Sequence, residues 1–248
     1  MLAKDRVAIV TGAGRGLGAA VAQELSREGA RVALCDIELS LAEEVAAAIR
    51  VHGGDAAAFG NDISRPAEAE DLVKATFERY GRVEILVNNA GICPRIPIDE
   101  MTEEAYDRIM NVNLKSVFFL SRAAGNAMKA RAWGRIVNIS SVGGRTGGIY
   151  NATVYGASKA GMMAMTRAFA RHFAPYNILV NCVAPGSVNT RLMANFSVES
   201  LQATINQVPL RRLADPSEVA RVIVFLASDG STYMTGATVD VNGGALMV

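Results

Sequence analysis

Short apolar segments alternate with longer amphipathic segments along almost the whole chain. The short segments are rich in β-branched residues, and those at 7–10, 83–87 and 135–139 are apolar without polar–apolar alternation. A continuous apolar run of this length is typical of a strand covered on both faces. The pattern predicts seven strands, at 7–10, 32–35, 56–59, 84–88, 135–139, 178–183 and 238–241.

Between the strands, longer segments carry apolar residues at helical spacing. The six predicted helices lie near 17–28, 40–52, 66–80, 103–131, 155–173 and 216–227. Strands that alternate with helices of this length indicate βαβ units and a parallel sheet. No linker, repeat or shift in composition divides the chain. We therefore expect one α/β domain over residues 1–248, a doubly wound, Rossmann-type fold whose mostly parallel seven-stranded sheet carries helices on both faces.

The segment 187–213 breaks this alternation. It carries scattered apolar residues and follows the sixth predicted strand. In a doubly wound sheet, ligands bind beyond the carboxyl ends of the strands. A long insertion at that place favours a substrate lid, and a packing excursion of the chain is the alternative.

Composition excludes several classes of protein. The net charge of +1, with no local cluster of Lys and Arg, argues against a nucleic-acid partner. The sequence shows no signal peptide and no apolar stretch long enough to cross a bilayer, so no membrane association is expected. The widely spaced Cys35, Cys93 and Cys182 indicate buried thiols of a reducing compartment, which favours the cytoplasm. Two histidines and no paired cysteines make a metal site unexpected.

A glycine-rich segment at 11–18 directly follows the first predicted strand and precedes a helix. Its sequence Thr-Gly-Ala-Gly-Arg-Gly-Leu-Gly fits the spacing T-G-x-x-x-G-x-G, whereas the spacing G-x-G-x-x-G would place Leu17 at the third glycine. Such a turn lets the backbone approach a pyrophosphate at the helix N-terminus, where amide groups and the helix dipole favour anions. The segment therefore predicts a dinucleotide site, with a merely flexible turn as the alternative.

Two charged residues bear on which dinucleotide would bind. Asp36 ends the second predicted strand, where a carboxylate hydrogen-bonds the adenosine ribose of NAD and repels the extra phosphate of NADP. Arg15 argues the other way, because a guanidinium in the glycine loop could pair with that phosphate. Asp36 would meet the phosphate directly and Arg15 could turn into solvent, so we expect NAD, with NADP less favoured.

Tyr155 and Lys159 are separated by four residues in a predicted helix. This spacing places the phenol and the ammonium on one helix face. A neighbouring ammonium favours the phenolate, so we expect a lowered pKa for Tyr155 and a role as general acid and base at a hydroxyl or carbonyl group. Chance can also supply such a spacing, so the pair alone does not decide.

With these motifs, the chain resembles the short-chain dehydrogenase/reductase family, in its single-domain branch of about 250 residues. The resemblance covers nearly the whole chain. It rests on the glycine loop, on Asn-Asp-Ile at 61–63, on Asn-Asn-Ala-Gly at 88–91, on Asn113 and Ser141, on Tyr-x-x-x-Lys at 155–159 and on Pro-Gly-Ser-Val-Asn-Thr at 185–190. The loop between Ser141 and Tyr155 is one residue longer than in many members.

The resemblance implies roles for the catalytic set Asn113, Ser141, Tyr155 and Lys159. Tyr155 would exchange a proton with the substrate oxygen, and Ser141 would donate a hydrogen bond to that oxygen. Lys159 would hold the nicotinamide ribose and depress the pKa of Tyr155. Asn113 would hold a water that links Lys159 to solvent. Ser140 is the alternative to Ser141, but the step from Asn113 and the Val-Gly-Gly that follows favour Ser141.

The loop and the resemblance together indicate a set of cofactor-binding residues. Asp62 would meet the adenine amine, and the segment 185–190 would hold the nicotinamide carboxamide. The set is Gly12, Gly14, Arg15, Gly16, Leu17, Gly18, Asp36, Ile37, Asp62, Ile63, Asn89, Ala90, Gly91, Tyr155, Lys159, Pro185, Gly186, Val188 and Thr190.

For the substrate, the residues expected to make contact are Ser141, Arg145, Asn151, Tyr155, Ser187 and Met193. They mix polar and apolar groups, which suits a small secondary alcohol, a polyol or a cyclic ketone. Arg145 could bind a substrate carboxylate, and solvation at the surface is the alternative. The resemblance also implies a homotetramer, although core packing would equally explain the small and Met residues of helix 155–173.

Two other functions stay open beside an NAD(H)-linked alcohol dehydrogenase or ketoreductase. The first is a 3-oxoacyl-[acyl-carrier-protein] reductase, against which Asp36 speaks because those reductases usually take NADPH. The second is a dinucleotide-binding sensor without turnover. An intact set of four catalytic residues weighs against a sensor, which has no need for them.

Overall fold

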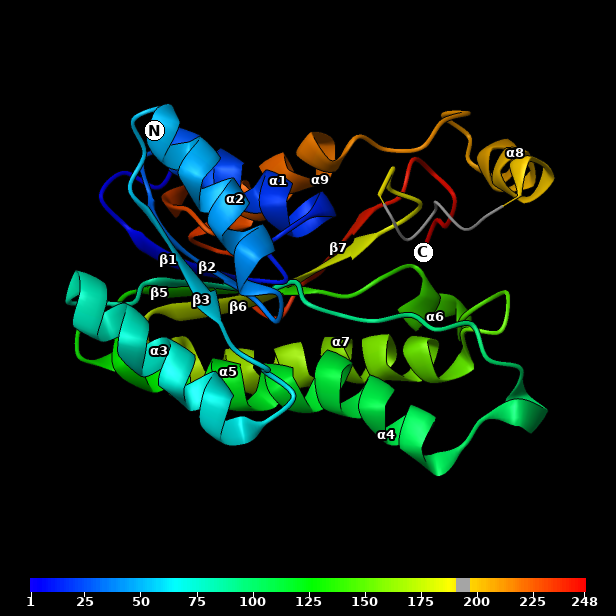
Figure 1. Cartoon of the computed structure of the whole chain (residues 1–248), viewed down its shortest axis with the longest axis horizontal. Helices are drawn as coiled ribbons and strands as arrows, with labels where there is room; N and C mark the ends of the chain where they lie inside the picture. The colour runs from blue at the N-terminus through cyan, green and yellow to red at the C-terminus, as the bar shows by residue number, and fades with distance from the viewer. Residues whose placement is uncertain (191–196) are drawn as a thin grey trace.

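Seven parallel strands form one sheet in the order β3-β2-β1-β4-β5-β6-β7 (Figure 1). The computed structural model describes residues 1–190 and 197–248. All neighbouring pairs of strands in this sheet are parallel, so the predicted sheet is confirmed, and it is wholly rather than mostly parallel. The strands are β1 (Val7–Thr11), β2 (Arg31–Asp36), β3 (Ala56–Gly60), β4 (Ile85–Asn88), β5 (Gly134–Ile139), β6 (Ile178–Pro185) and β7 (Thr238–Val241).

Helices cover both faces of the sheet, as predicted. One face carries α1 (Gly16–Arg27), α2 (Leu39–Val51) and α9 (Pro216–Leu226), and the other carries α3 (Pro66–Tyr80), α5 (Ser116–Lys129) and α7 (Thr153–Phe173) (Figure 1). Shorter helices are α4 (Glu103–Met110), α6 (Gly143–Thr146) and α8 (Val198–Gln207), with single turns at Ile98–Glu100, Ala174–Tyr176 and Asp229–Ser231. In the described part of the chain, no helix is both long and apolar enough to span a membrane.

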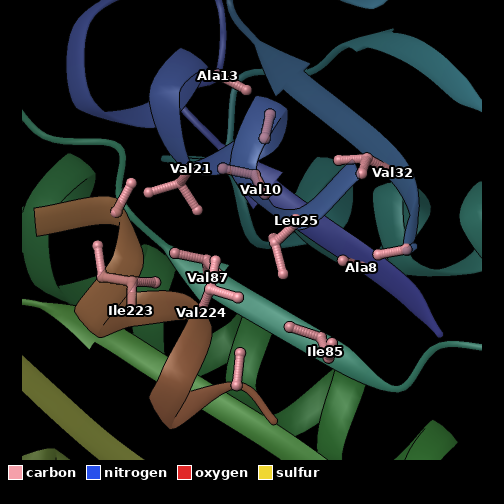
Figure 2. Packing of buried hydrophobic residues seen from close by; sticks show 14 of the residues in the cluster. Ala8, Val10, Ala13, Val21, Leu25, Val32, Ile85, Val87, Ile223 and Val224 are labelled. Carbon is pink, nitrogen blue, oxygen red and sulfur yellow. The ribbon is translucent and has the colours of Figure 1, made fainter. Parts of the chain in front are cut away.

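Successive residues of the central strands pack into two separate cores. In β1, Ala8 and Val10 face α1 and α9, where they meet Leu25 and Ile223 (Figure 2). The intervening Ile9 packs with residues of α3, α5 and α7 on the other side. Because side chains alternate across a strand, a strand covered on both faces needs apolar residues at every position, and this explains the uninterrupted apolar runs.

The helix predicted over 103–131 is interrupted. It divides into α4 and α5, joined by a π-helical turn at Asn111–Lys115. A π turn inserts an extra residue into the helix, and such turns often lie at functional sites. Here the extra residue turns Asn113 into the interior, where it is fully buried. Two further helices, α6 and α8, were not predicted.

The order of the strands reverses between β1 and β4. The chain runs outward from β1 to β3 and then returns to pair β4 with the other edge of β1. The loops after β1 and β4 therefore diverge to opposite faces and open a crevice between them, which is where doubly wound sheets bind ligands.

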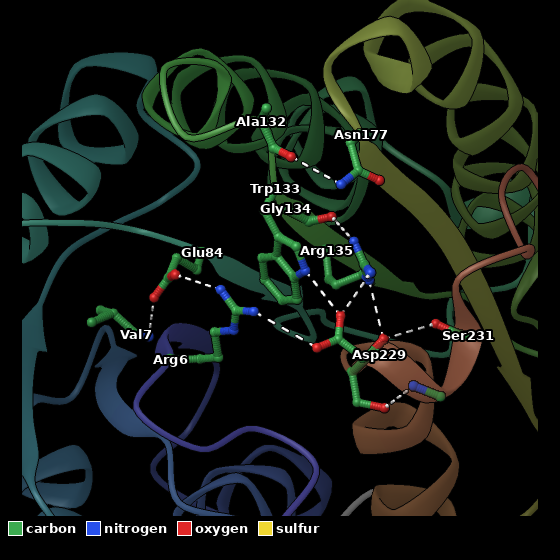
Figure 3. Close-up of polar contacts among 12 residues, drawn as sticks. Arg6, Val7, Glu84, Ala132, Trp133, Gly134, Arg135, Asn177, Asp229 and Ser231 are labelled. Atoms are coloured by element: carbon green, nitrogen blue, oxygen red, sulfur yellow. Dashed lines mark hydrogen bonds and ion pairs between the residues drawn. The ribbon is translucent and has the colours of Figure 1, made fainter.

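At the opposite end of the sheet, charged residues tie the strand starts together (Figure 3). Glu84 is buried, accepts from Arg6 at 2.8 Å and from the Val7 amide at 3.1 Å, and lies 3.1 Å from Arg82. Arg6 also lies over the Trp133 ring, 3.7 Å from its centroid. These contacts join the start of β1 to the start of β4.

Beside them, the fully buried Arg135 donates to the Ser228 carbonyl at 3.1 Å and to Asp229 at 3.3 Å. Its guanidinium lies 4.3 Å from the centroid of the Trp133 ring, and the indole of Trp133 donates to Asp229 at 2.9 Å. This second group of contacts joins β5 to the turn after α9.

Removing the buried carboxylate should destabilise the fold. We expect Glu84→Ala to lower the free energy of unfolding by about 3 kcal/mol, because Arg6 and Arg82 lose their buried partner. Chemical denaturation measures the change. Glu78→Ala, which removes an exposed ion pair with Lys74, is the control and should cost less than about 1 kcal/mol. Equal losses in the two variants would contradict this reading of Glu84.

Candidate active site

A cleft of about 1840 Å³ lies along the carboxyl ends of the strands. Its walls come from the ends of β1 to β6 and the loops that follow them, from the start of α7, and from α4 and the residues around the start of α8. The cleft extends from the glycine loop to Tyr155, so both predicted functional regions open into one space.

The glycine loop has the backbone that a pyrophosphate site requires. Gly12 and Gly16 have φ values of 61° and 56°, in the left-handed region that favours glycine. A Cβ atom on Gly18 would lie 2.0 Å from the Gly12 carbonyl oxygen, so only glycine fits there. The loop leads directly into α1, whose first amide groups point to the cleft end of the helix. The residues present therefore fit a dinucleotide pyrophosphate.

The end of β4 is bonded to the glycine loop. The Asn89 side chain donates to the carbonyls of Thr11 and Gly12 at 2.9 and 3.1 Å. The Thr11 hydroxyl accepts from the amides of Asn89 and Ala90 at 3.1 and 3.2 Å. These bonds fix the distance across the crevice, and they show that Asn89 shapes the loop as well as lining the cleft.

Asp36 lies at the end of β2 and lines the cleft. Its carboxylate accepts from the Gly14 amide at 3.0 Å and from the Glu38 amide at 3.1 Å, and the side chain of Arg15 donates to Glu38 at 2.7 Å. Arg15 therefore has an ion-pair partner, although its side chain stays half exposed. The predicted position of Asp36 holds, but the carboxylate also has a structural role in the turn after β2.

Tyr155, Lys159 and Ser141 converge on the same part of the cleft. The Lys159 ammonium is buried, lies 5.7 Å from the centroid of the Tyr155 ring and donates to the Ile139 carbonyl at 2.7 Å. The Ser141 hydroxyl accepts from the Gly143 amide at 3.0 Å. These residues come from the end of β5, the turn into α6 and the first turns of α7.

The alternative serine is committed elsewhere. Ser140 is buried and donates its hydroxyl hydrogen to the Lys159 carbonyl at 2.8 Å. The Ser141 hydroxyl instead makes a hydrogen bond that lowers the pKa of Tyr155. The geometry therefore favours Ser141 over Ser140 as the serine beside the tyrosine.

Burial dominates the ionisation of the tyrosine and the lysine. Desolvation raises the pKa of Tyr155 to about 12, and the hydrogen bond with Ser141 opposes this only in part. Desolvation also lowers the pKa of Lys159 to about 8. The prediction that Lys159 lowers the pKa of Tyr155 is therefore wrong, because the pKa of Tyr155 is raised in this structure. Removing the phenolate from water costs more free energy than the neighbouring charges return.

Asn113 holds the backbone beside the cleft. Its side-chain oxygen accepts from the Ile92 amide at 2.8 Å, and its amide group donates to the Ile92 carbonyl at 2.9 Å and to the Ser158 hydroxyl at 3.2 Å. The side-chain amide thus has partners for both hydrogens and for its oxygen. Asn113 does not line the cleft directly, whereas Ile92 does.

Most of the other predicted residues line the cleft. Thr190 approaches the glycine loop, since a Cβ atom on Gly16 would lie 3.4 Å from its methyl carbon. The predicted residues in the lining are Gly12, Arg15, Gly16, Leu17, Gly18, Asp36, Ile37, Asp62, Ile63, Asn89, Ala90, Gly91, Ser141, Asn151, Tyr155, Lys159, Pro185, Val188 and Thr190.

Four predicted contacts do not line the cleft. Arg145 pairs through two hydrogen bonds, at 2.9 and 2.8 Å, with Asp240 of β7, so the expected carboxylate-binding role is not supported. Gly14 and Gly186 instead permit close packing, against Leu41 and Asn242 respectively. The Ser187 carbonyl bonds to the Ala214 amide.

Met193 lies outside the described residues. Sequence reasoning also missed several residues around the cleft. Glu38, which binds Arg15, carried no signal beyond its place before a predicted helix. A second group was hidden because the pattern merged α4 into a longer helix and left 197–207 without one: Thr102, Glu104, Ala105, Arg108, Ser197 and Ser200.

Comparison with known proteins agrees with this geometry. A family model described as Enoyl-(Acyl carrier protein) reductase matches residues 12–245. The chain is 40% identical to 3-oxoacyl-[acyl-carrier-protein] reductase FabG of Pseudomonas aeruginosa over 247 residues, which is the full length of both chains. It is also 40% identical to L-rhamnose 1-dehydrogenase (NAD(P)(+)) of Azotobacter vinelandii over 255 residues, covering 98% of each chain.

Among solved structures, the fold matches that of a candidate short-chain alcohol dehydrogenase from Sinorhizobium meliloti. The TM-score is 0.94 and the identity is 37%, covering 98% of this chain and 96% of that chain. The chain belongs to the short-chain dehydrogenase/reductase family. Members of this family are oxidoreductases that use nicotinamide dinucleotides, so the chain is assigned to that class.

The burial of Lys159 predicts a specific dependence of stability on pH. Between pH 8 and 10.5, the unfolded chain binds more protons at this residue than the folded chain does, so stability rises with pH across this window. We therefore compare the wild type with Lys159→Met. Between pH 7 and pH 10, the free energy of unfolding of the wild type should rise by about 2 kcal/mol more than that of the variant. Denaturant titrations across this range measure the difference. Lys74→Met, at an exposed position of α3, should parallel the wild type. If the difference in unfolding free energy between the wild type and Lys159→Met stays constant with pH, the pKa of Lys159 is not lowered in the folded chain.

Proposed function

We propose that the chain interconverts a secondary alcohol and a ketone with NAD(H) as the hydride carrier. One observation carries the proposal: Tyr155, Lys159 and Ser141 meet in a cleft that continues to the glycine loop and Asp36. A proton-transfer group thus opens into the same space as a dinucleotide cradle, which is the arrangement that a hydride-transfer reaction requires.

The residues of the chain would divide the work as follows. The nicotinamide dinucleotide, when bound, supplies the hydride chemistry. Tyr155 is protonated at neutral pH, given its raised pKa, and would donate its proton to the ketone oxygen. In the direction of alcohol oxidation, it would first lose that proton and then accept one from the alcohol as the phenolate. Ser141 would donate a hydrogen bond to the same oxygen and polarise it. Lys159 uses one hydrogen on the Ile139 carbonyl, which leaves two for the ribose hydroxyls of the nicotinamide.

We propose an indirect role for Asn113. Its amide holds the main chain of Ile92, and Ile92 lines the cleft beside Gly91. A Cβ atom on Gly91 would lie 3.4 Å from the Lys159 ammonium, so this backbone passes against the lysine. Because the side chain is already engaged, a water that links Lys159 to solvent would bond to the main chain of the π turn.

For the cofactor we propose NAD rather than NADP. Support comes from Asp36 at the end of β2, which faces the cleft and is held there by two backbone amides. The charge of Arg15 beside it is paired with Glu38. The carboxylate of Asp36 therefore disfavours an extra phosphate on the adenosine ribose.

The segment 187–213 is proposed as the substrate lid. Its two ends are joined by a bridge between Val188 and Ala214 and by the bond from the Asn189 amide to the Ala214 carbonyl. Within it, Ser197 and Ser200 line the cleft. Residues 191–196 of this segment lie outside the described part of the structure. The closed base and the two serines in the cleft wall support a lid at this place.

A second candidate function is the reduction of a 3-oxoacyl thioester on an acyl carrier protein. The full-length similarity to the Pseudomonas aeruginosa reductase favours it. The name of the Azotobacter vinelandii relative instead gives a sugar as substrate. The two relatives share chemistry between a hydroxyl and a carbonyl group, and this common reaction supports the class that we propose.

We also propose that the chain works in the cytoplasm as a homotetramer. Cys35, Cys93 and Cys182 are free thiols, which fits a reducing compartment. An apolar groove of about 350 Å³ joins α5 and α7, and its rim includes the half-exposed ring of Phe118. The helices α5 and α7 would bury this groove against a second copy of the chain.

Replacing the tyrosine should separate catalysis from binding. We expect Tyr155→Phe to retain less than about 1% of the turnover, because the loss of a positioned general acid and base costs on the order of 100-fold or more. NADH should still bind, as judged by its fluorescence. Tyr233→Phe, at a fully exposed position outside the lining of the cleft, is the control and should keep most of the activity. Retention of turnover by Tyr155→Phe would sink the mechanism.

A cofactor-consumption screen should identify the reaction. We expect the oxidation of polyols and small secondary alcohols with NAD, or the reduction of their ketones with NADH. Acetoacetyl thioesters with NADPH form the competing arm. If turnover is seen only with the thioesters and NADPH, the function is that of the second candidate, the acyl-carrier-protein reductase. If there is no turnover in either arm, the chain is a dinucleotide binder without catalysis.

Light scattering coupled to gel filtration tests the assembly. We expect a mass of four chains for the wild type and a smaller assembly for Phe118→Glu, because the charge would have to be buried in the interface. Phe77→Glu, at an exposed position of α3, is the control and should leave the mass unchanged. A monomeric wild type would contradict the proposal.

A further inference from the structure

Four neighbouring residues of the cofactor end are linked in a closed ring of contacts. The Gly14 amide donates to one oxygen of Asp36, and the Glu38 amide donates to the other. The Glu38 side chain accepts from Arg15, which follows Gly14 in the chain. The ring therefore joins the glycine loop to the turn before α2 through both main chain and side chains.

Within this ring, Arg15 is the group that could accept NADP. It lines the cleft together with Asp36 and Ile37, at the end of β2 where the adenosine ribose binds in this fold. A guanidinium in that place suits a phosphate, because it can donate two parallel hydrogen bonds. Arg15 is instead bound to Glu38 at 2.7 Å, and both side chains are about half exposed, 45% and 54%.

We infer that Glu38 is a specificity-determining residue, which keeps the site selective for NAD by holding Arg15 and so withholding it from the phosphate of NADP. Asp36 repels the phosphate, and Glu38 removes Arg15, a cation of the glycine loop that would attract it. This inference rests on the proposed use of NAD. Cofactor selectivity would then depend on two residues: Asp36 acts directly, and Glu38 acts through Arg15.

The geometry also couples the two carboxylates. Asp36 positions the main chain of Glu38, so the loss of Asp36 loosens the residue that holds Arg15. Replacing Asp36 should therefore free the arginine in part, and the effects of replacing both acids should not simply add.

Binding measurements with NADH and NADPH test the inference independently of turnover. We expect Glu38→Gln to tighten NADPH by about fivefold, the upper end of what releasing an exposed ion pair supplies, and to change the NADH dissociation constant less than about twofold. Calorimetry or nicotinamide fluorescence gives both constants. Glu43→Gln, which breaks the exposed pair with Arg50 in α2, is the matched control and should change neither constant.

The arginine must carry the gain. In an Arg15→Gln background, Glu38→Gln should tighten NADPH by less than about twofold, since Glu38 then has no arginine at position 15 to release. A full gain without Arg15 would mean that Glu38 acts by its own charge alone, and it would overturn the inference. An unchanged NADPH constant in Glu38→Gln itself would overturn it equally.

The proposed function is tested separately by Asp36→Ala. If this variant changes the ratio of the NADPH and NADH constants and Glu38→Gln does not, the inference about Glu38 is wrong and the proposed use of NAD stands. If neither variant changes the ratio while NADH still binds, the adenosine ribose does not bind at the end of β2, and the selective roles of Asp36 and Glu38 both fail.

Discussion

Parallel pairing of all seven strands is the constraint on which the rest of the molecule depends. Because of this pairing, the carboxyl ends of all the strands lie at one edge of the sheet. Residues that are far apart in the chain therefore meet at that edge. The crevice exists because the order reverses between β1 and β4, and Asn89 and Thr11 then hold its two sides at a fixed distance. At the amino ends of the strands, the buried charges of Glu84 and Arg135 hold neighbouring segments together.

Much of this arrangement could be predicted from the sequence, because the signals were local. Uninterrupted apolar runs such as 7–10 gave the strands, and the glycine spacing at 12–18 follows from backbone angles and close contacts that only glycine tolerates. Tyr155 and Lys159 share a helix, so a separation of four residues was enough to place them together.

What could not be predicted depends on tertiary contacts. The π turn at Asn111–Lys115 arises because Asn113 bonds to a distant backbone segment, and no periodicity encodes that. Arg145 carried the right chemistry for an anion, but its partner Asp240 lies on another strand. The pKa of Tyr155 was predicted in the wrong direction because sequence spacing reports a neighbouring charge and does not report desolvation.

The contact between Val188 and Ala214 has a consequence for the evolution of the chain. It closes the base of the intervening segment independently of what lies within it. The entropy of closing such a loop grows slowly, by only about 0.6 kcal/mol for each doubling of its length. The residues beyond Thr190 can thus be exchanged or lengthened at a small cost in chain entropy, so the proposed lid can change while β6 and the glycine loop keep their contacts.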